Sequence, residues 1–136
     1  MRCMMDHIAL NVEDVETMID FYTTVLGLAP ERLLAFREGE VAFPSLRLNP
    51  DTIVDLFPPE MWHHDAAGQP GRCGLNHFCF SMERSEWEAL CQRLETDRIT
   101  IKDGPDPRWG AHGIGRSIYF RDPEGNLLEA RYYEED

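Results

Sequence analysis

Positive charge is scarce in this sequence. Lys102 is the only lysine, and 13 lysines and arginines stand against 25 aspartates and glutamates, which gives a formal net charge of −12. Proteins that bind nucleic-acid backbones need a clustered cationic face, and anchors on acidic membranes need a run of basic residues. We therefore expect neither a nucleic-acid partner nor a membrane anchor.

Long hydrophobic runs and paired cysteines are missing as well. No stretch approaches the roughly 20 apolar residues that cross a bilayer, and His7 lies too early in the chain to leave room for a signal peptide. The cysteines show no C-x-x-C spacing, which argues against a structural zinc site and favours reduced thiols. These absences predict a cytoplasmic protein. The cysteines are Cys3, Cys73, Cys79 and Cys91.

What the chain does contain is one pattern stated twice. A histidine opens a strand, and a carboxylate lies in a later strand of the same module: His7 with Asp55, then His77 with Glu129. In each histidine strand, large apolar side chains alternate with the histidine and with small or polar residues. One face should therefore pack beneath a helix, and the face with the histidine should line a hollow.

A helix is expected after each histidine strand. Apolar residues recur at helical spacing over 15–26, with Asp14 as the N-cap and Gly27 beyond the C-terminal end. In the second copy, Ser85 and Glu88 form a capping box. Shorter extended segments should follow. They lie at about 31–37, 40–49 and 52–57 in the first copy, and at about 98–102, 114–121 and 126–133 in the second.

Glycine and proline mark the connections. Residues 104–115 are predicted to form a mobile loop, and residues 122–126 a tight turn between the last two strands. The 136 residues then read as a single domain with a first module over about 1–58, a linker over about 59–74 and a second module over about 75–136. A hydrophobic content of 43% is ample for a packed core.

Two imidazoles and one or two carboxylates that converge from four strands favour a divalent transition metal. Three protein ligands would leave coordination positions for a substrate. The alternative is that His7 and His77 are ordinary strand residues with local hydrogen bonds, but their equivalent positions in a repeat favour the metal. Asp55 is either a further ligand or base, or a hydrogen-bonded strand residue.

The end of the second module carries a specific motif. Residues 115–129 read G-x-S-φ-Y-F-x-D-P-x-G-N-x-φ-E, where φ is apolar, and both modules begin H-φ-x-φ. Over essentially the whole chain this resembles the vicinal oxygen chelate superfamily, which includes glyoxalase I, fosfomycin-resistance enzymes, extradiol dioxygenases and bleomycin-binding proteins. The resemblance implies an α+β fold of two βαβββ modules. Their curved mixed sheet would surround a metal-containing pocket, with helices on the outer face.

By this resemblance, His7, His77 and Glu129 hold one divalent transition metal (Fe, Mn, Ni, Zn or Co). Asp55 stands where glyoxalase I and the epimerases carry glutamate or glutamine, so it is a fourth ligand, a base or neither. Tyr119 matches a pocket tyrosine of the fosfomycin enzymes and extradiol dioxygenases, and it either donates a hydrogen bond or proton or fills the wall. Candidates for substrate binding, unless they are solvated surface residues, are Ser117, Arg131, Arg116, Trp109 and His112.

The leading functional prediction is a lyase or isomerase that resembles glyoxalase I. The metal would bind two adjacent substrate oxygens and stabilise an enediolate while Glu129 or Asp55 moves a proton. The alternatives are an extradiol-type dioxygenase, a fosfomycin-type thiol transferase, and a metal-free drug-binding protein of the bleomycin-resistance type. The resemblance also implies a homodimer, since some members complete the site between two chains.

Overall fold

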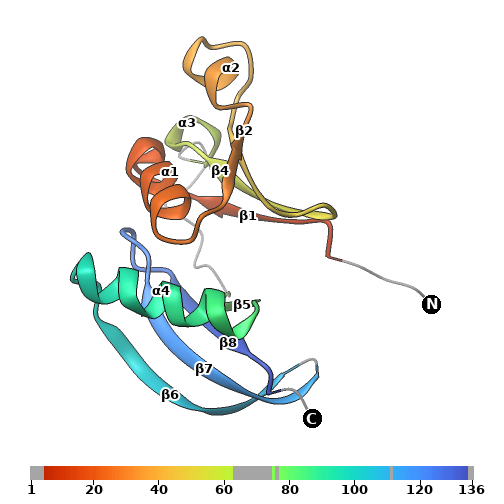
Figure 1. Ribbon diagram of the computed structural model, residues 1–136. Coiled ribbons are helices and arrows are strands. Elements are labelled where there is room, and N and C mark those ends of the chain that lie inside the picture. The colour runs from red at the N-terminus through yellow and green to blue at the C-terminus, as the bar shows by residue number, and fades with distance from the viewer. Residues whose placement is uncertain (1–4, 63–74, 76, 111, 135–136) are drawn as a thin grey trace. The chain divides into compact units, whose positions relative to one another are not determined.

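The chain divides into two compact units, Met1–Cys73 and Gly74–Asp136. The computed structural model describes residues 5–62, 75, 77–110 and 112–134. Each unit contains a four-stranded mixed sheet with helices (Figure 1). The predicted α+β class with two repeated modules is therefore confirmed.

The first unit has its strands in the order β1-β4-β3-β2. Strand β1 runs parallel to β4, and the other pairs are antiparallel. Its elements are β1 (His7–Asn11), α1 (Val15–Thr24), β2 (Ala29–Glu31), α2 (Leu33–Arg37), β3 (Ser45–Asn49), β4 (Thr52–Phe57) and α3 (Pro59–Trp62).

The second unit repeats this topology with the order β5-β8-β7-β6. Its first strand is again parallel to its last, and the other neighbours are antiparallel. Its elements are β5 (Phe78–Ser81), α4 (Arg84–Thr96), β6 (Ile101–Gly110), β7 (Gly113–Arg121) and β8 (Leu127–Tyr132).

Helix α1 forms where its apolar spacing predicts. The side chain of Asp14 accepts a hydrogen bond from the Thr17 amide at 3.0 Å, so the predicted N-cap is confirmed. The helix buries Met18, Ile19 and Tyr22 among others, which is the stripe expected of a helix packed on a sheet.

The predicted capping box of Ser85 and Glu88 is wrong. Helix α4 already begins at Arg84, and the residue at its N-cap, Glu83, makes no capping hydrogen bond with its side chain. The helix is held by packing instead. Trp87 is 7% exposed, and its Nε1 donates to the Ala130 carbonyl at 2.9 Å. This contact seats α4 on one face of β8 and leaves the opposite face, which carries Glu129, to the site.

Two further predictions fail for identifiable reasons. Residues 31–37 are extended only at Glu31, where β2 ends, because 33–37 are mostly good helix formers and make the short helix α2. Residues 104–115 are not a loop but belong mostly to strands β6 and β7, which pair from Ile101–Phe120 to Gly110–Gly113. Prolines are tolerated there because β6 is an edge strand.

At one position of this hairpin, the close approach of two backbones requires a glycine. Gly104 has φ +91°, and a Cβ at this position would lie 2.3 Å from the carbonyl oxygen of Ser117. The glycine therefore reflects contact between β6 and β7 rather than loop mobility. The predicted turn at 122–126 is confirmed, since Oδ1 of Asp122 accepts from the amides of Glu124 and Asn126, both at 2.9 Å.

The predicted linker begins with the short helix α3, and its remaining part, residues 63–74, lies outside the described residues.

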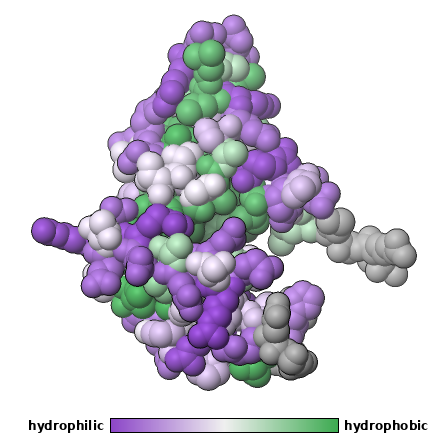
Figure 2. Space-filling model, viewed as in Figure 1, coloured by the Kyte–Doolittle hydropathy of each residue, from purple (hydrophilic) through white to green (hydrophobic). Residues whose placement is uncertain are grey.

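Hydrophobic side chains reach the surface at the top of Figure 2, where α2 lies. This helix buries none of its residues, and Leu34 is 68% exposed. No helix in the described part of the chain is long and apolar enough to cross a membrane.

Candidate functional site

The two histidines hold the same place relative to the two carboxylates. In the first unit, Asp55 on β4 pairs with Ala9 on β1, two residues after His7. In the second unit, Glu129 on β8 pairs with the residue two positions after His77. Because side chains two apart on a strand share a face, each unit carries its histidine and carboxylate on one face of a parallel strand pair.

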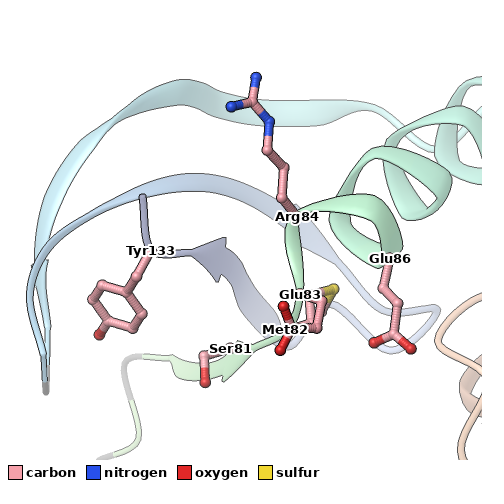
Figure 3. A pocket seen from close by; sticks show the side chains of 6 residues that line it. All are labelled: Ser81, Met82, Glu83, Arg84, Glu86 and Tyr133. Atoms are coloured by element: carbon pink, nitrogen blue, oxygen red, sulfur yellow. The ribbon is translucent and has the colours of Figure 1, made fainter. Parts of the chain in front are cut away.

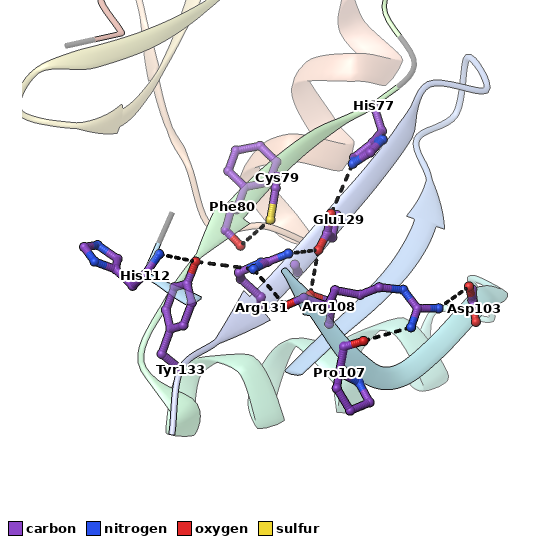
Figure 4. A network of polar contacts seen from close by, with 12 residues as sticks. His77, Cys79, Phe80, Asp103, Pro107, Arg108, His112, Glu129, Arg131 and Tyr133 are labelled. Carbon is purple, nitrogen blue, oxygen red and sulfur yellow. Dashed lines mark hydrogen bonds and ion pairs between the residues drawn. The ribbon is translucent and has the colours of Figure 1, made fainter. Parts of the chain in front are cut away.

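In the second unit this placement brings the two groups together. Nε2 of His77 lies 3.1 Å from Oε1 of Glu129 (Figure 4). Glu129 is 3% exposed, whereas the His77 side chain is 35% exposed. The carboxylate is thus buried beneath the histidine, whose ring faces both the carboxylate and solvent.

The second oxygen of Glu129 is held by two donors. Oγ of Ser117 donates to Oε2 at 2.6 Å, and Nη2 of Arg131 donates to the same oxygen at 2.5 Å. Arg131 also donates to the hydroxyl of Tyr133 at 3.3 Å and to the carbonyl of Arg108 at 3.4 Å (Figure 4). A buried carboxylate and a buried guanidinium therefore neutralise each other.

These contacts decide the charge of the pair. Burial by itself would raise the pKa of Glu129, but the hydrogen bonds from Ser117 and Arg131 and the positive charge outweigh it, so the pKa lies below its usual 4.5. Burial would lower the pKa of Arg131, yet the hydrogen bond to Glu129 keeps it above its usual value. Both side chains are charged at neutral pH.

Tyr119 completes this group. It lies directly opposite Glu129 in the pairing of β7 with β8, and its ring meets the ring of His77 edge-on with centroids 5.6 Å apart. Burial, together with the Glu129 carboxylate, raises the pKa of the Tyr119 phenol above 10. The phenol therefore keeps its proton, and its side chain is hydrogen-bonded to Glu129.

In the first unit, the histidine and the carboxylate have separate partners. Asp55 is 6% exposed and accepts a hydrogen bond from Oγ of Ser45 at 2.6 Å. His7 is exposed, and its Nδ1 lies 2.7 Å from Asp6. That hydrogen bond raises the pKa of His7, and the nearby charge of Asp55 adds to the effect.

The donor set fits a divalent metal in part. Around a metal with bonds of about 2.1 Å, neighbouring nitrogen and oxygen ligands lie roughly 3.0–3.4 Å apart, and His77 and Glu129 are separated by 3.1 Å. An imidazole and a carboxylate also suit such an ion. Among the described residues, no three histidine, cysteine, aspartate or glutamate side chains form a cluster that could hold a metal ion. His77 and Glu129 are thus two fitting ligands rather than a complete set.

The predicted substrate-binding residues fall into two groups. Ser117 and Arg131 are buried and engaged with Glu129. The others lie further away or are not fully described. Arg116 is exposed on the opposite face of β7, His112 is exposed with its amide donating to Tyr133, and Trp109 is placed in β6 by its backbone alone.

Sequence reasoning missed one neighbour of the site, Arg108. Arg108 lies in the stretch predicted to be a loop, yet it comes from β6, pairs with Asp103 at 3.0 Å, and its charge acts on Tyr119. Cys79 lies on the His77 face, two residues after the histidine. Burial and the charge of Glu129 raise the pKa of its thiol to about 11. The alternation of β5 placed Cys79, but no local pattern marks Arg108.

An open groove lies at the far end of the same strands. Its volume is about 450 Å³, and it is lined by Ser81 at the end of β5, Tyr133 just after β8 and the start of α4 (Figure 3). Tyr133 is shared between this groove and the hydrogen-bond network of Arg131. The groove therefore adjoins the site without containing His77 or Glu129.

Comparison with known proteins identifies the superfamily to which this fold and sequence correspond. A model of the glyoxalase/bleomycin resistance protein/dioxygenase superfamily matches residues 4–130. The chain belongs to this superfamily. The virulence protein STM3117 of Salmonella typhimurium is 34% identical to this chain over 130 residues, which cover 94% of this chain and 83% of the relative. The crystal structure of that protein matches with a TM-score of 0.77 at 30% identity, over 98% of this chain and 99% of the other.

Two more distant members of the glyoxalase superfamily are named as enzymes. The glutathione transferase FosA of Serratia marcescens is 27% identical, covering 92% of this chain and 77% of the relative. The lactoylglutathione lyase of Pseudomonas aeruginosa is 26% identical, covering 91% and 79%. The superfamily thus includes both transferases and lyases, and the predicted resemblance is confirmed at the level of the superfamily.

Proposed function

We propose that this protein is a divalent-metal-dependent enzyme that acts on a small molecule with adjacent oxygen atoms. The pairing of His77 with the buried, charged Glu129 is the observation that carries this proposal. A metal held there would supply Lewis-acid stabilisation of negative charge on the substrate. Tyr119 would donate a hydrogen bond or a proton to a substrate oxygen, since its phenol keeps its proton and its ring lies beside His77.

The reaction class we propose first is that of a lyase or isomerase of the glyoxalase type, in which a carboxylate moves a proton. The lactoylglutathione lyase relative supports it. Asp55 would be the more mobile base of the two carboxylates, because it accepts a hydrogen bond from Ser45, whereas Glu129 is bonded to both Ser117 and Arg131.

Thiol transfer is the second candidate. It needs no carboxylate that gains and loses a proton, and the tightly held Glu129 suits a fixed ligand better than a base. The glutathione transferase FosA among the relatives is consistent with this reaction. An assay with glutathione separates the two classes: a 2-oxoaldehyde would be isomerised as its glutathione adduct by a lyase, whereas an epoxide would be opened by a transferase.

Further parts of the proposal come from the sequence. His7 is proposed as a third ligand, and the protein is proposed to be a cytoplasmic homodimer without nucleic-acid or membrane partners. Arg116, Trp109 and His112 remain candidates for substrate binding. The metal is Fe, Mn, Ni, Zn or Co in this proposal.

Elemental mass spectrometry of protein purified without chelator or affinity-tag histidines is the direct test. We expect stoichiometric metal in the wild type and loss of most of it in His77→Ala and Glu129→Ala, with circular dichroism showing that the fold is retained. Glu95→Ala, an exposed change on α4, is the matched control. Stoichiometric iron would favour the dioxygenase alternative. A protein that neither contains nor takes up metal would refute the proposal and favour the drug-binding alternative.

A further inference from the structure

We propose that Arg131 is a positioning residue. Together with Ser117 it would fix the Glu129 carboxylate so that this residue offers a metal one oxygen only. The inference rests on the proposed function, since it takes Glu129 as a metal ligand. It assigns Arg131 a role through Glu129 in place of direct contact with substrate.

The geometry around the carboxylate separates its two oxygens. Oε2 receives both the hydroxyl of Ser117 at 2.6 Å and the guanidinium of Arg131 at 2.5 Å. A carboxylate oxygen has two lone-pair directions, so these donors occupy the acceptor capacity of Oε2. Oε1 is the oxygen that lies 3.1 Å from His77. Glu129 can then ligate through Oε1, on the side of His77.

Arg131 is itself held in place. Its side chain is 5% exposed, its Nη1 lies 3.3 Å from the hydroxyl of Tyr133 and 3.4 Å from the Arg108 carbonyl, and its guanidinium carbon is 5.6 Å from the centre of the Tyr133 ring. A planar guanidinium fixed on several sides aims its donors, whereas a lysine ammonium would supply charge without this orientation. Arg131 thus provides direction as well as neutralisation.

Comparison of the two units shows that this arrangement belongs to the second one. Ser81 pairs with Arg131 in the second unit, and the equivalent pair in the first unit is Asn11 with Phe57. The position two residues after the carboxylate is therefore aromatic in the first unit and cationic in the second. The repeat does not require an arginine there, which favours a role specific to Glu129.

The test measures Co²⁺ binding by the visible absorption of the bound ion. It compares the wild type with three variants, Arg131→Met, Arg131→Lys and Ser117→Ala. Loss of a residue that orients a ligand weakens metal binding by about 10- to 100-fold. We expect a loss in this range for Arg131→Met and a changed absorption spectrum for both arginine variants, since the carboxylate can then turn. Arg121→Met, on the same sheet and bonded to the Gly125 carbonyl, is the control and should match the wild type.

A crystal structure of metal-free Arg131→Lys gives a readout that needs no metal. We expect Oε1 of Glu129 to have moved away from Nε2 of His77. If Arg131→Met fails to fold, Arg131→Lys and Ser117→Ala carry the comparison, because both keep the charge balance of the site. Wild-type affinity and spectrum in the folded arginine variants, with Glu129 in place, would overturn the inference alone. A folded wild type that binds no Co²⁺ would instead overturn the proposed function.

Discussion

Glu129 carries a negative charge where water has almost no access, since it is 3% exposed. A buried ion is costly unless donors and an opposite charge compensate it. Ser117 and Arg131 supply both. Their effect exceeds that of burial, so the Glu129 pKa falls below 4.5. The residue is therefore stable as an anion, as a metal ligand must be.

Because folding lowers the pKa of Glu129, the stability of the folded protein depends on pH in the acid range. A carboxylate with a lowered folded pKa contributes stability above its unfolded value, here 4.5, and loses this contribution as the pH falls through the folded pKa. We expect Glu129→Gln to be less stable than the wild type at neutral pH and to lose less further stability below about pH 4.5. Urea unfolding at a series of pH values measures this. Glu95→Gln is the control, and parallel curves for the wild type and Glu129→Gln would contradict the expectation.

Two helices of this fold are secured in different ways. Helix α1 has a side-chain cap from Asp14, whereas α4 begins after Glu83 without one and is fixed by Trp87 on β8. A cap satisfies a backbone amide that the helix leaves unpaired, and a buried aromatic ring contributes through packing. Helix α1 thus combines a local capping hydrogen bond with packing, whereas α4 is secured by tertiary packing without a side-chain cap.

This difference predicts unequal effects of matched substitutions. Asp14→Ala should lower the free energy of unfolding by about 1 kcal/mol, since it removes the capping hydrogen bond to the Thr17 amide. Glu83→Ala should change it by less than about 0.5 kcal/mol, as expected for surface positions without such a feature. Urea unfolding of both variants provides the comparison. Equal losses would show that the Asp14 bond contributes nothing specific.

At the scale of the whole molecule, the chain uses one topology twice but gives the two copies different chemistry. His77 and Glu129 are in contact in the second unit, whereas His7 and Asp55 bond to Asp6 and Ser45 in the first. The equivalent strand register of the two histidines is the argument for His7 as a ligand.

His7→Ala tests this prediction directly. We expect Co²⁺ affinity to fall at least about tenfold, because even outer residues of metal sites contribute that much. The fold should be unaffected, since His7 is exposed. Asn11→Ala, a change on the same face of β1, is the control. Unchanged affinity in His7→Ala, measured by Co²⁺ titration, would remove His7 from the ligand set.

The sequence by itself determined the features that depend on local periodicity and turn chemistry. Alternation placed His77 and Cys79 on one face of the first strand of the second unit. It likewise placed Glu129 and Arg131 on one face of the last strand. The turn at Asp122 marked where the last strand begins. The stripe and cap of α1 were equally readable. Each of these features involves residues a few positions apart, so a single segment contains the whole signal.

Only the tertiary structure decided which groups meet. The extended segment predicted at 114–121 is β7, but most of β6 escaped prediction because an edge strand draws its stability from a partner and tolerates proline and glycine. Without that pairing Arg108 could not be placed. The bonds of Arg131 and Ser117 to one oxygen of Glu129 depend on the register between β7 and β8. Register joins residues far apart in the chain, and the surroundings of a buried charge are set by such contacts rather than by its neighbours in sequence.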